Sequence, residues 1–344
     1  MKHSVFIRMI LPSLAAMILF IALPMVSVLV QSLFIEHEQV LVVGENCGPF
    51  GCTETTSVDA EATAKLREEQ PLGRFAGLSI YFGRNHLAST AVGEAWQTTD
   101  TFGEFLSALM NLRFYRALAF TLTYTFIVTP FVVVLGLATA VLVNALPKMV
   151  KGPTIFVTLL PMIVTPLIGS LVLFWMIDAR GILGATLAEL AGDPDLSLKA
   201  SMPLTWIMLM FYGIWHSFPF AFVILYAGLQ TVPQDTLEAS IIDGANRWQR
   251  VRFVVLPHLA PLVVFISLVQ LMDNFRVFEP VIGFQAQANA TSLSYIIYDD
   301  LRGGEVQLFG SAAATSILTI IGVCIMVTPV VIRTWRDFKQ RRRV

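Results

Sequence analysis

Long apolar stretches separated by shorter polar segments dominate the chain. Six of them reach the roughly 20 residues that a helix needs to cross a hydrocarbon core about 30 Å thick. We therefore predict an all-α integral membrane protein with six transmembrane helices. The expected spans are residues 7–34, 117–146, 154–177, 204–229, 256–282 and 306–332.

One polar region is too long to be a simple connection. Residues 36–116 carry eleven acidic side chains and predict a charged helix over 57–70, with Ser57 or Asp59 as its cap. The region is too short and too polar to build a large core of its own. We interpret it as a small periplasmic insert after the first span, acting either as a structural cap or as a docking surface for a partner.

Composition agrees with this pattern, and the basic residues set the orientation. The chain is 56% hydrophobic and 14% charged, whereas soluble domains carry about 25% charged residues. Thirteen of the 23 Lys and Arg residues fall at the N-terminus, in the loop around Lys148, in the loop 233–256 and in the tail 333–344. Because basic residues stay on the cytoplasmic side, both termini are expected there.

Two of the three cysteines form a pair in the insert. Cys47 and Cys52 lie five residues apart in a Gly/Pro-containing segment of an extracytoplasmic loop, which favours a disulfide over two free thiols. No metal site is expected, since two sulfurs without neighbouring ligands do not fill a tetrahedral site. Cys324 lies in an apolar span and is interpreted as a packing residue.

The loop between the fourth and fifth spans has its own internal pattern. Pro233 suits the first turn of a short helix, and Asp235 and Glu238 suit its positive end. Gly244 suits its stop. Trp248 and Val251 then recur at helical spacing, with arginines between them. We predict a short cytoplasmic helix followed by an amphipathic turn at the membrane surface.

The same loop carries a family resemblance. Glu238-Ala239-Ser240, then Gly244 four residues on, then Leu256-Pro257, resemble the EAA loop of permease subunits in binding-protein-dependent ABC importers. The resemblance extends from about residue 102 to the end of the chain and is closest to the carbohydrate branch, which includes the maltose permease. One departure is the segment 283–289, where that branch usually has a Gly-Gly-Pro stretch.

The resemblance implies a type I ABC importer permease fold in the bacterial inner membrane, and an EAA loop that couples to the ATPase. It also implies three protein partners: a second, homologous permease that completes a heterodimer, an ATPase dimer and a periplasmic solute-binding protein. ATP and Mg²⁺ would be used by the ATPase, with no cofactor on this chain. The implied coupling residues are Glu238, Ala239, Ser240, Asp243, Gly244, Leu256 and Pro257.

Polar side chains inside a transmembrane helix cost free energy, so they are candidates for functional residues. Placed against the maltose permease through the EAA loop, the solute-contact positions fall on Ser217, Phe220, Gln270, Asp273, Asn274 and Val277. The last four are spaced so that they share one face of an unbroken helix. His216 is a further candidate. Alternatively, Asp273 and Arg276 neutralise each other, and His216 and Phe220 serve packing.

Other classes of function find less support. An enzyme would need clustered catalytic residues at membrane depth, and the five histidines are scattered. The chain lacks a Gly-rich phosphate-binding loop and basic stretches interleaved with aromatics, so neither ATP nor nucleic acid is an expected ligand. Lipid surrounds the spans. The alternatives are an ABC permease for an amino acid, phosphate or peptide and, less favoured, an ion-driven secondary transporter, which would show an internal repeat.

Overall fold

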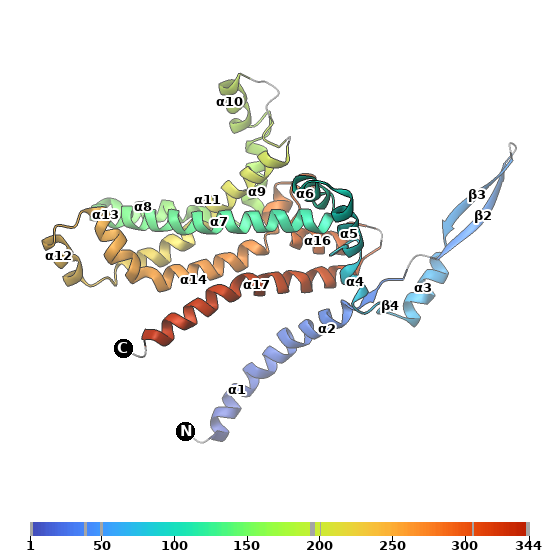
Figure 1. The fold of residues 1–344 in the computed structure, drawn as a ribbon, viewed down its shortest axis with the longest axis horizontal. Coiled ribbons are helices and arrows are strands. Elements are labelled where there is room, and N and C mark those ends of the chain that lie inside the picture. The colour runs from blue at the N-terminus through green and yellow to red at the C-terminus, as the bar shows by residue number, and fades with distance from the viewer. Residues whose placement is uncertain are drawn as a thin grey trace. The chain divides into compact units, whose positions relative to one another are not determined.

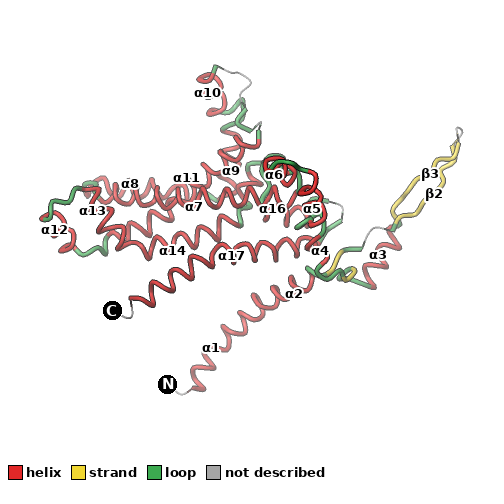
Figure 2. Tube along the Cα trace, in the orientation of Figure 1, coloured by secondary structure: helices red, strands yellow, loops and turns green. Residues whose placement is uncertain are grey.

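A computed structural model describes residues 3–37, 40–48, 51–192, 197–199, 201–304 and 306–341. Helices dominate these residues (Figure 2). The chain divides into two compact units, one made of residues 1–115 and 296–320 and the other of residues 116–295 and 321–344. Three helices run from one unit into the other along the chain: α7 (Arg113–Asn144), α16 (Leu293–Arg302) and α17 (Phe309–Arg341).

Among the described residues, five helices are long and apolar enough to cross a membrane, and a sixth crossing results if one bent pair counts as a single span. The five are Met9–Gln31, Arg113–Asn144, Met202–Leu229, Arg247–Phe275 and Phe309–Arg336. The expected helical fold is thus confirmed, with bounds that differ from those expected. The first helix ends at Gln31, short of Phe34, because Phe34 belongs to a strand.

Helices α7, α8 (Lys148–Ile163), α11 (Met202–Leu229) and α14 (Leu256–Phe275) pack together in the second unit (Figure 1). Their contacts depend on small residues. A Cβ at Gly136 of α7 would collide with the backbone of Phe222 in α11, 2.9 Å away. Fully buried side chains fill the space between the helices, including Phe120, Leu209, Phe222, Leu225 and Ile266.

The third expected span is not one straight helix. Helix α8 ends at Ile163, and α9 (Pro166–Met176) continues at 91° to it. Thr165 is extended, with φ −63° and ψ 144°, which is the conformation that a following proline imposes. Pro166 then starts α9, so this proline ends one helix and begins the next.

The fifth expected span also differs. Its helix begins earlier, at α13 (Arg247–Arg250), passes through the π-helical turn η2 (Val251–Val255) and ends with α14 at Phe275. The expectation that it extends to Ile282 is wrong, because Arg276 leaves the helical conformation at φ −102°, ψ 24°. A separate short helix, α15 (Glu279–Gly283), packs against α9, and α10 (Ile182–Ala191) follows α9.

The first unit begins with α1 (His3–Met17), the π-helical turn η1 (Ile18–Ala22) and α2 (Leu23–Gln31). Strand β1 (Phe34–Ile35) pairs with β4 (Arg74–Phe75), and β2 (Leu41–Gly48) pairs with β3 (Gly51–Val58), both antiparallel. The register of β2 and β3 places Cys47 opposite Cys52. Their side chains lie outside the described part of the structure, so the disulfide stays a prediction.

The helix expected within the insert is confirmed. Helix α3 (Ala60–Glu69) begins after Asp59, whose Oδ1 accepts hydrogen bonds from the backbone N–H groups of Glu61 and Ala62. The helices α4 (Ser79–Phe82), α5 (Ser89–Thr98) and α6 (Phe102–Met110) follow. The Asp59 carboxylate satisfies N–H groups that the first turn leaves without helical partners.

A charged cluster ties the start of α7 to α16 within this unit. Arg113 binds Asp299 at 2.6 Å and Asp300 at 2.8 Å, and Ser311 donates to the second oxygen of Asp300 at 2.6 Å. Asp300 is buried, so removing Arg113 would leave a buried carboxylate without its counter-ion.

Candidate coupling loop and solute site

The predicted coupling helix is present as α12 (Gln234–Ile242), beyond the ends of α11 and α14 (Figure 1). Pro233 precedes it and Asp235 lies in its first turn. The bundle holds it through the preceding turn: the Gln230 side chain donates to Asn144 Oδ1 at 3.1 Å, and Thr231 Oγ1 lies 3.1 Å from His258 Nε2. The helix is therefore a short projection with a fixed base.

Gly244 ends this helix as expected. Its φ is +78°, which an L side chain rarely adopts. The N–H of Ala245 bonds to the carbonyl of Ser240 and that of Gly244 to the carbonyl of Ile241, both at 3.0 Å. This pair of bonds is a Schellman motif. It reverses the chain immediately after α12.

The return to the membrane starts with a capping box that the sequence interpretation missed. Asn246 Oδ1 accepts from the N–H of Gln249, and Gln249 Oε1 accepts from the N–H of Asn246, both at 2.8 Å. The signal was present, since Asn followed three residues later by Gln is the pattern of such a cap. The predicted amphipathic turn corresponds to α13 and η2, where Trp248 and Phe253 are exposed.

Most predicted coupling residues are exposed. Glu238, Ala239, Asp243, Gly244 and Pro257 lie on the surface, and Leu256 is 39% exposed. Ser240 differs, because it is buried and its hydroxyl donates to the carbonyl of Leu237 at 2.6 Å. Ile242, at 87% exposure, adds an apolar side chain that the sequence interpretation did not single out. The loop thus presents charged and apolar groups together.

Two of the predicted solute positions lie together in the interior. Asn274 Nδ2 donates to Thr129 Oγ1 of α7 at 3.0 Å and to Gln270 Oε1 at 3.4 Å. Gln270 and Asn274 are 5% and 6% exposed. Thr129 was not predicted, and nothing in its local sequence distinguishes it from other span threonines. In this structure the three side chains join α7 to α14.

The expectation that four positions share one face of a helix is wrong. Val277 follows the end of α14 and is buried in the core. Asp273 is on the exposed side, where its carboxylate binds Arg276 at 3.1 Å and both side chains are 60% exposed. Gln270 and Asn274 therefore line the interior, whereas Asp273 lies on the exposed side of the helix.

The candidates on α11 lie near the break between α8 and α9. His216 Nε2 is 3.0 Å from the carbonyl oxygen of Val164, and Tyr212 donates to the carbonyl of Pro166 at 2.9 Å. Val164 lies between the two helices, so its carbonyl has no helical hydrogen bond, and an unpaired carbonyl is costly inside a membrane. This contact favours the packing interpretation of His216. Phe220 packs against the core, and Ser217 is partly buried.

Comparison with known proteins decides the family. Residues 103–334 match the family described as binding-protein-dependent transport system inner membrane component. The chain belongs to this family. The trehalose transport system permease SugA of Mycobacterium tuberculosis is 29% identical over 258 residues, which cover 74% of this chain and 79% of SugA. The sn-glycerol-3-phosphate transport system permease UgpA of Escherichia coli O157:H7 is 30% identical over 257 residues, covering 70% and 85%.

The fold agrees with this membership. A chain in the crystal structure of a bacterial ABC transporter involved in the import of the acidic polysaccharide alginate superposes with a TM-score of 0.59. The match covers 79% of this chain and 95% of that one, at 18% sequence identity. The protein is a permease subunit of an ABC importer, and the loop of residues 233–256 lies within the region that matches the family.

Proposed function

We propose that this permease forms half of the translocation pathway for a sugar or sugar-derived solute. The support is the set of relatives, since the names of the permeases from M. tuberculosis and E. coli give trehalose and sn-glycerol-3-phosphate as their solutes. Another permease relative, MalF of Thermococcus litoralis, is named for trehalose and maltose. Each solute carries several hydroxyl groups, which require hydrogen-bonding partners along the pathway.

Coupling to ATP hydrolysis is assigned to α12. The helix is short, its base is held by Gln230 and Thr231, and Gly244 reverses the chain directly after it. A rigid projection of this kind transmits a push from the ATPase to α11 and α14 on either side. Glu238 offers a carboxylate to a basic partner side chain, and Ile241 and Ile242 offer an apolar contact.

The solute pathway is assigned to the exposed face of α14. The exposed residues of this helix recur at helical spacing and include His258, Pro261, Phe265 and Met272, and the exposed Arg276 follows its last residue. Asp273 adds a carboxylate beside them. An ion pair facing lipid is costly, so we assign this face to a water-filled path or to the second permease rather than to lipid.

A groove continues this face toward the coupling loop. It has a volume of about 540 Å³ and lies between α11 and α14, with Val223, Ala227 and Leu262 among its apolar walls and Thr231 and His258 as polar residues. Val223 and Ala227 lie three and seven residues after Phe220, so they extend the face of that candidate position. The path therefore includes Ser217, Phe220 and Asp273, whereas Gln270 and Asn274 hold α14 against α7.

The proposed assembly contains this permease, a second homologous permease, two ATPase subunits and a periplasmic solute-binding protein, in the bacterial inner membrane with both termini cytoplasmic. ATP hydrolysis belongs to the ATPase subunits. A structural relative supports this composition: the alginate ABC transporter has been crystallised in complex with an alginate pentasaccharide-bound periplasmic protein. The coupling loop and the exposed face of α14 are the surfaces assigned to the partner subunits.

Purification in gentle detergent from the native membrane, with mass spectrometry of the co-purified chains, tests the proposal. We expect a second permease and an ATPase, both lost from Glu238→Lys, and ATP-dependent uptake of trehalose or glycerol 3-phosphate by the reconstituted complex. Gln97→Lys in the insert is the matched control, and this variant should still co-purify with the second permease and the ATPase. Recovery of this chain alone, with uptake that persists without ATP, would overturn the assignment in favour of a secondary transporter.

A further inference from the structure

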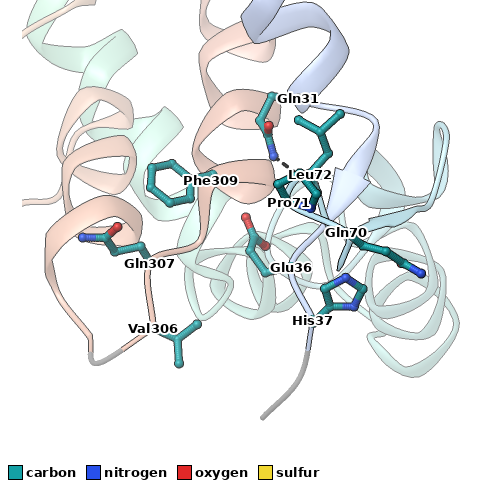
Figure 3. A pocket seen from close by; sticks show the side chains of 10 residues that line it. Gln31, Glu36, His37, Gln70, Pro71, Leu72, Val306, Gln307 and Phe309 are labelled. Carbon is teal, nitrogen blue, oxygen red and sulfur yellow. Dashed lines mark hydrogen bonds between the residues drawn. The ribbon is translucent and has the colours of Figure 1, made fainter. Parts of the chain in front are cut away.

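A polar cavity of about 200 Å³ lies within the unit formed by residues 1–115 and 296–320. Its walls come from the end of α2, the segment after β1, the turn before β4 and the start of α17 (Figure 3). None of the coupling or solute candidates lines it. Six side chains supply most of its chemistry: Gln31, Glu36, His37, Gln70, Gln307 and Phe309.

The walls of this cavity are held in place by close backbone packing. The Glu36 carboxylate accepts a hydrogen bond from the backbone N–H of Gly310 in the first turn of α17, where the helix end favours a negative charge. Gln31 donates to the carbonyl of Leu72 at 3.4 Å. A Cβ at Gly73 would collide with the backbone of Ile35. The site is thus formed before any ligand enters it.

Several hydrogen-bonding groups in the walls are unused. His37 Nε2 is buried and has no hydrogen-bond partner among the described residues. The side-chain amides of Gln70 and Gln307, which are exposed, and the second carboxylate oxygen of the partly buried Glu36 make no hydrogen bond to protein within the same described ranges. Figure 3 shows Gln307 and Phe309 on one side of the space and Glu36 and His37 on the other. Buried polar groups are normally paired, so the unpaired His37 Nε2 beside the partly buried Glu36 carboxylate indicates a bound polar molecule.

We propose that this cavity binds a single sugar ring on the extracytoplasmic side of the permease. Amide, carboxylate and imidazole groups offer both donors and acceptors to neighbouring hydroxyls, and the ring of Phe309 offers an apolar wall to the C–H face of the sugar. At about 30 Å³ per water molecule, the cavity holds one ring and excludes an oligosaccharide. The ligand class and the side of the membrane rest on the proposed function.

The test uses the complete transporter in lipid nanodiscs without its solute-binding protein. Cys47, Cys52 and Cys324 are replaced by Ser, and Val306→Cys places one thiol in the cavity wall. We expect D-glucose to slow alkylation of this thiol several-fold, and Gln307→Leu to abolish the protection. A thiol at Gln97→Cys, in the same unit outside the cavity, should react at the same rate with and without glucose.

Two results would overturn the inference. One is alkylation at Val306→Cys that glucose leaves unchanged. The other is slower alkylation of the Val306→Cys thiol when the solute-binding protein is added in the absence of glucose. That result would mean that the cavity receives a segment of the solute-binding protein. Neither result would contradict the proposed function. That function would be contradicted if the wild-type transporter showed no ATP-dependent uptake. Gln70→Leu provides a second variant, should Gln307→Leu fail to assemble.

Discussion

His216 places its Nε2 3.0 Å from the carbonyl oxygen of Val164, 52 residues earlier in the chain. This contact joins α11 to the point where the third span turns by 91°. A break in a membrane helix leaves carbonyl groups without their i+4 partners, and they need donors from elsewhere. Tyr212, one helical turn before His216, also donates to the carbonyl of Pro166, the first residue of α9. The sharp turn is therefore held by two side chains of one neighbouring helix.

Replacing His216 by Leu should destabilise the permease. The Val164 carbonyl, exposed at the break, would lose its donor, and an unpaired carbonyl is costly inside a membrane. Thermal unfolding of the purified complex, followed by tryptophan fluorescence, measures the effect, and His216→Gln should restore part of it. If His216→Leu unfolds like the wild type but abolishes binding of the solute, the residue contacts solute instead.

The hydrogen bond from Asn274 to Thr129 makes a second prediction. Thr129→Val and Asn274→Leu should each weaken the contact of α7 with α14, by about 0.6 kcal/mol on average for such bonds in membranes. The double variant should lose less stability than the sum of the two single losses, and the difference is the coupling energy of the double-mutant cycle. Ser267→Ala, on α14 without a bond to α7, is the control. Independent effects would mean that the bond contributes nothing.

The sequence was most informative where local chemistry decides the structure. The hydropathy pattern located the apolar helices, and Gly244 marked the end of the predicted coupling helix. For α3 the sequence left Ser57 and Asp59 as alternative caps; Asp59 is the cap, and Ser57 belongs to β3. The sequence could not predict the positions of side chains that bind partners far away along the chain. The turn at Thr165 and Pro166 had a local signal, yet its direction depends on His216 and Tyr212. Asp273 and Asn274 are neighbours in sequence, and only their partners Arg276 and Thr129 show that the first is exposed and the second buried.

The stability of the folded protein at low pH should depend on Asp178. The hydrogen bond from Lys199, at 2.6 Å, lowers the pKa of the Asp178 carboxyl below its usual value, helped by the backbone N–H of Arg180 and the lysine charge. A lowered folded-state pKa means that this stabilisation is present above the unfolded-state value, near 3.8, and is lost as the pH falls through the folded value. Thermal unfolding at pH 7 and below 4 should show a smaller acid loss for Asp178→Asn. Asp100→Asn should keep the wild-type acid loss.

Cys47 and Cys52 should be joined in the mature protein. They are register partners in the β2–β3 pair, and the expected periplasmic location is oxidising. Peptide mass spectrometry without reduction should recover the single peptide that contains both cysteines in its unalkylated form, lighter by two hydrogens than the dithiol, and after reduction the same peptide should carry two alkyl groups. Alkylation of both thiols before reduction would show that they are free.

The sharpest prediction concerns Gly244. Its φ of +78° is strained for any residue with a Cβ, and a residue in this region costs on the order of 1–2 kcal/mol. No other atom approaches a Cβ built there within 4 Å, so Gly244→Ala changes only the backbone preference. We expect the turn after α12 to loosen, with ATP hydrolysis by the complex retained and solute uptake per ATP reduced. Gly152→Ala, at a helical position with equally open surroundings, should leave that ratio unchanged. Because the lever must be rigid to transmit motion, an unaltered ratio in Gly244→Ala would show that the Schellman turn has no part in coupling.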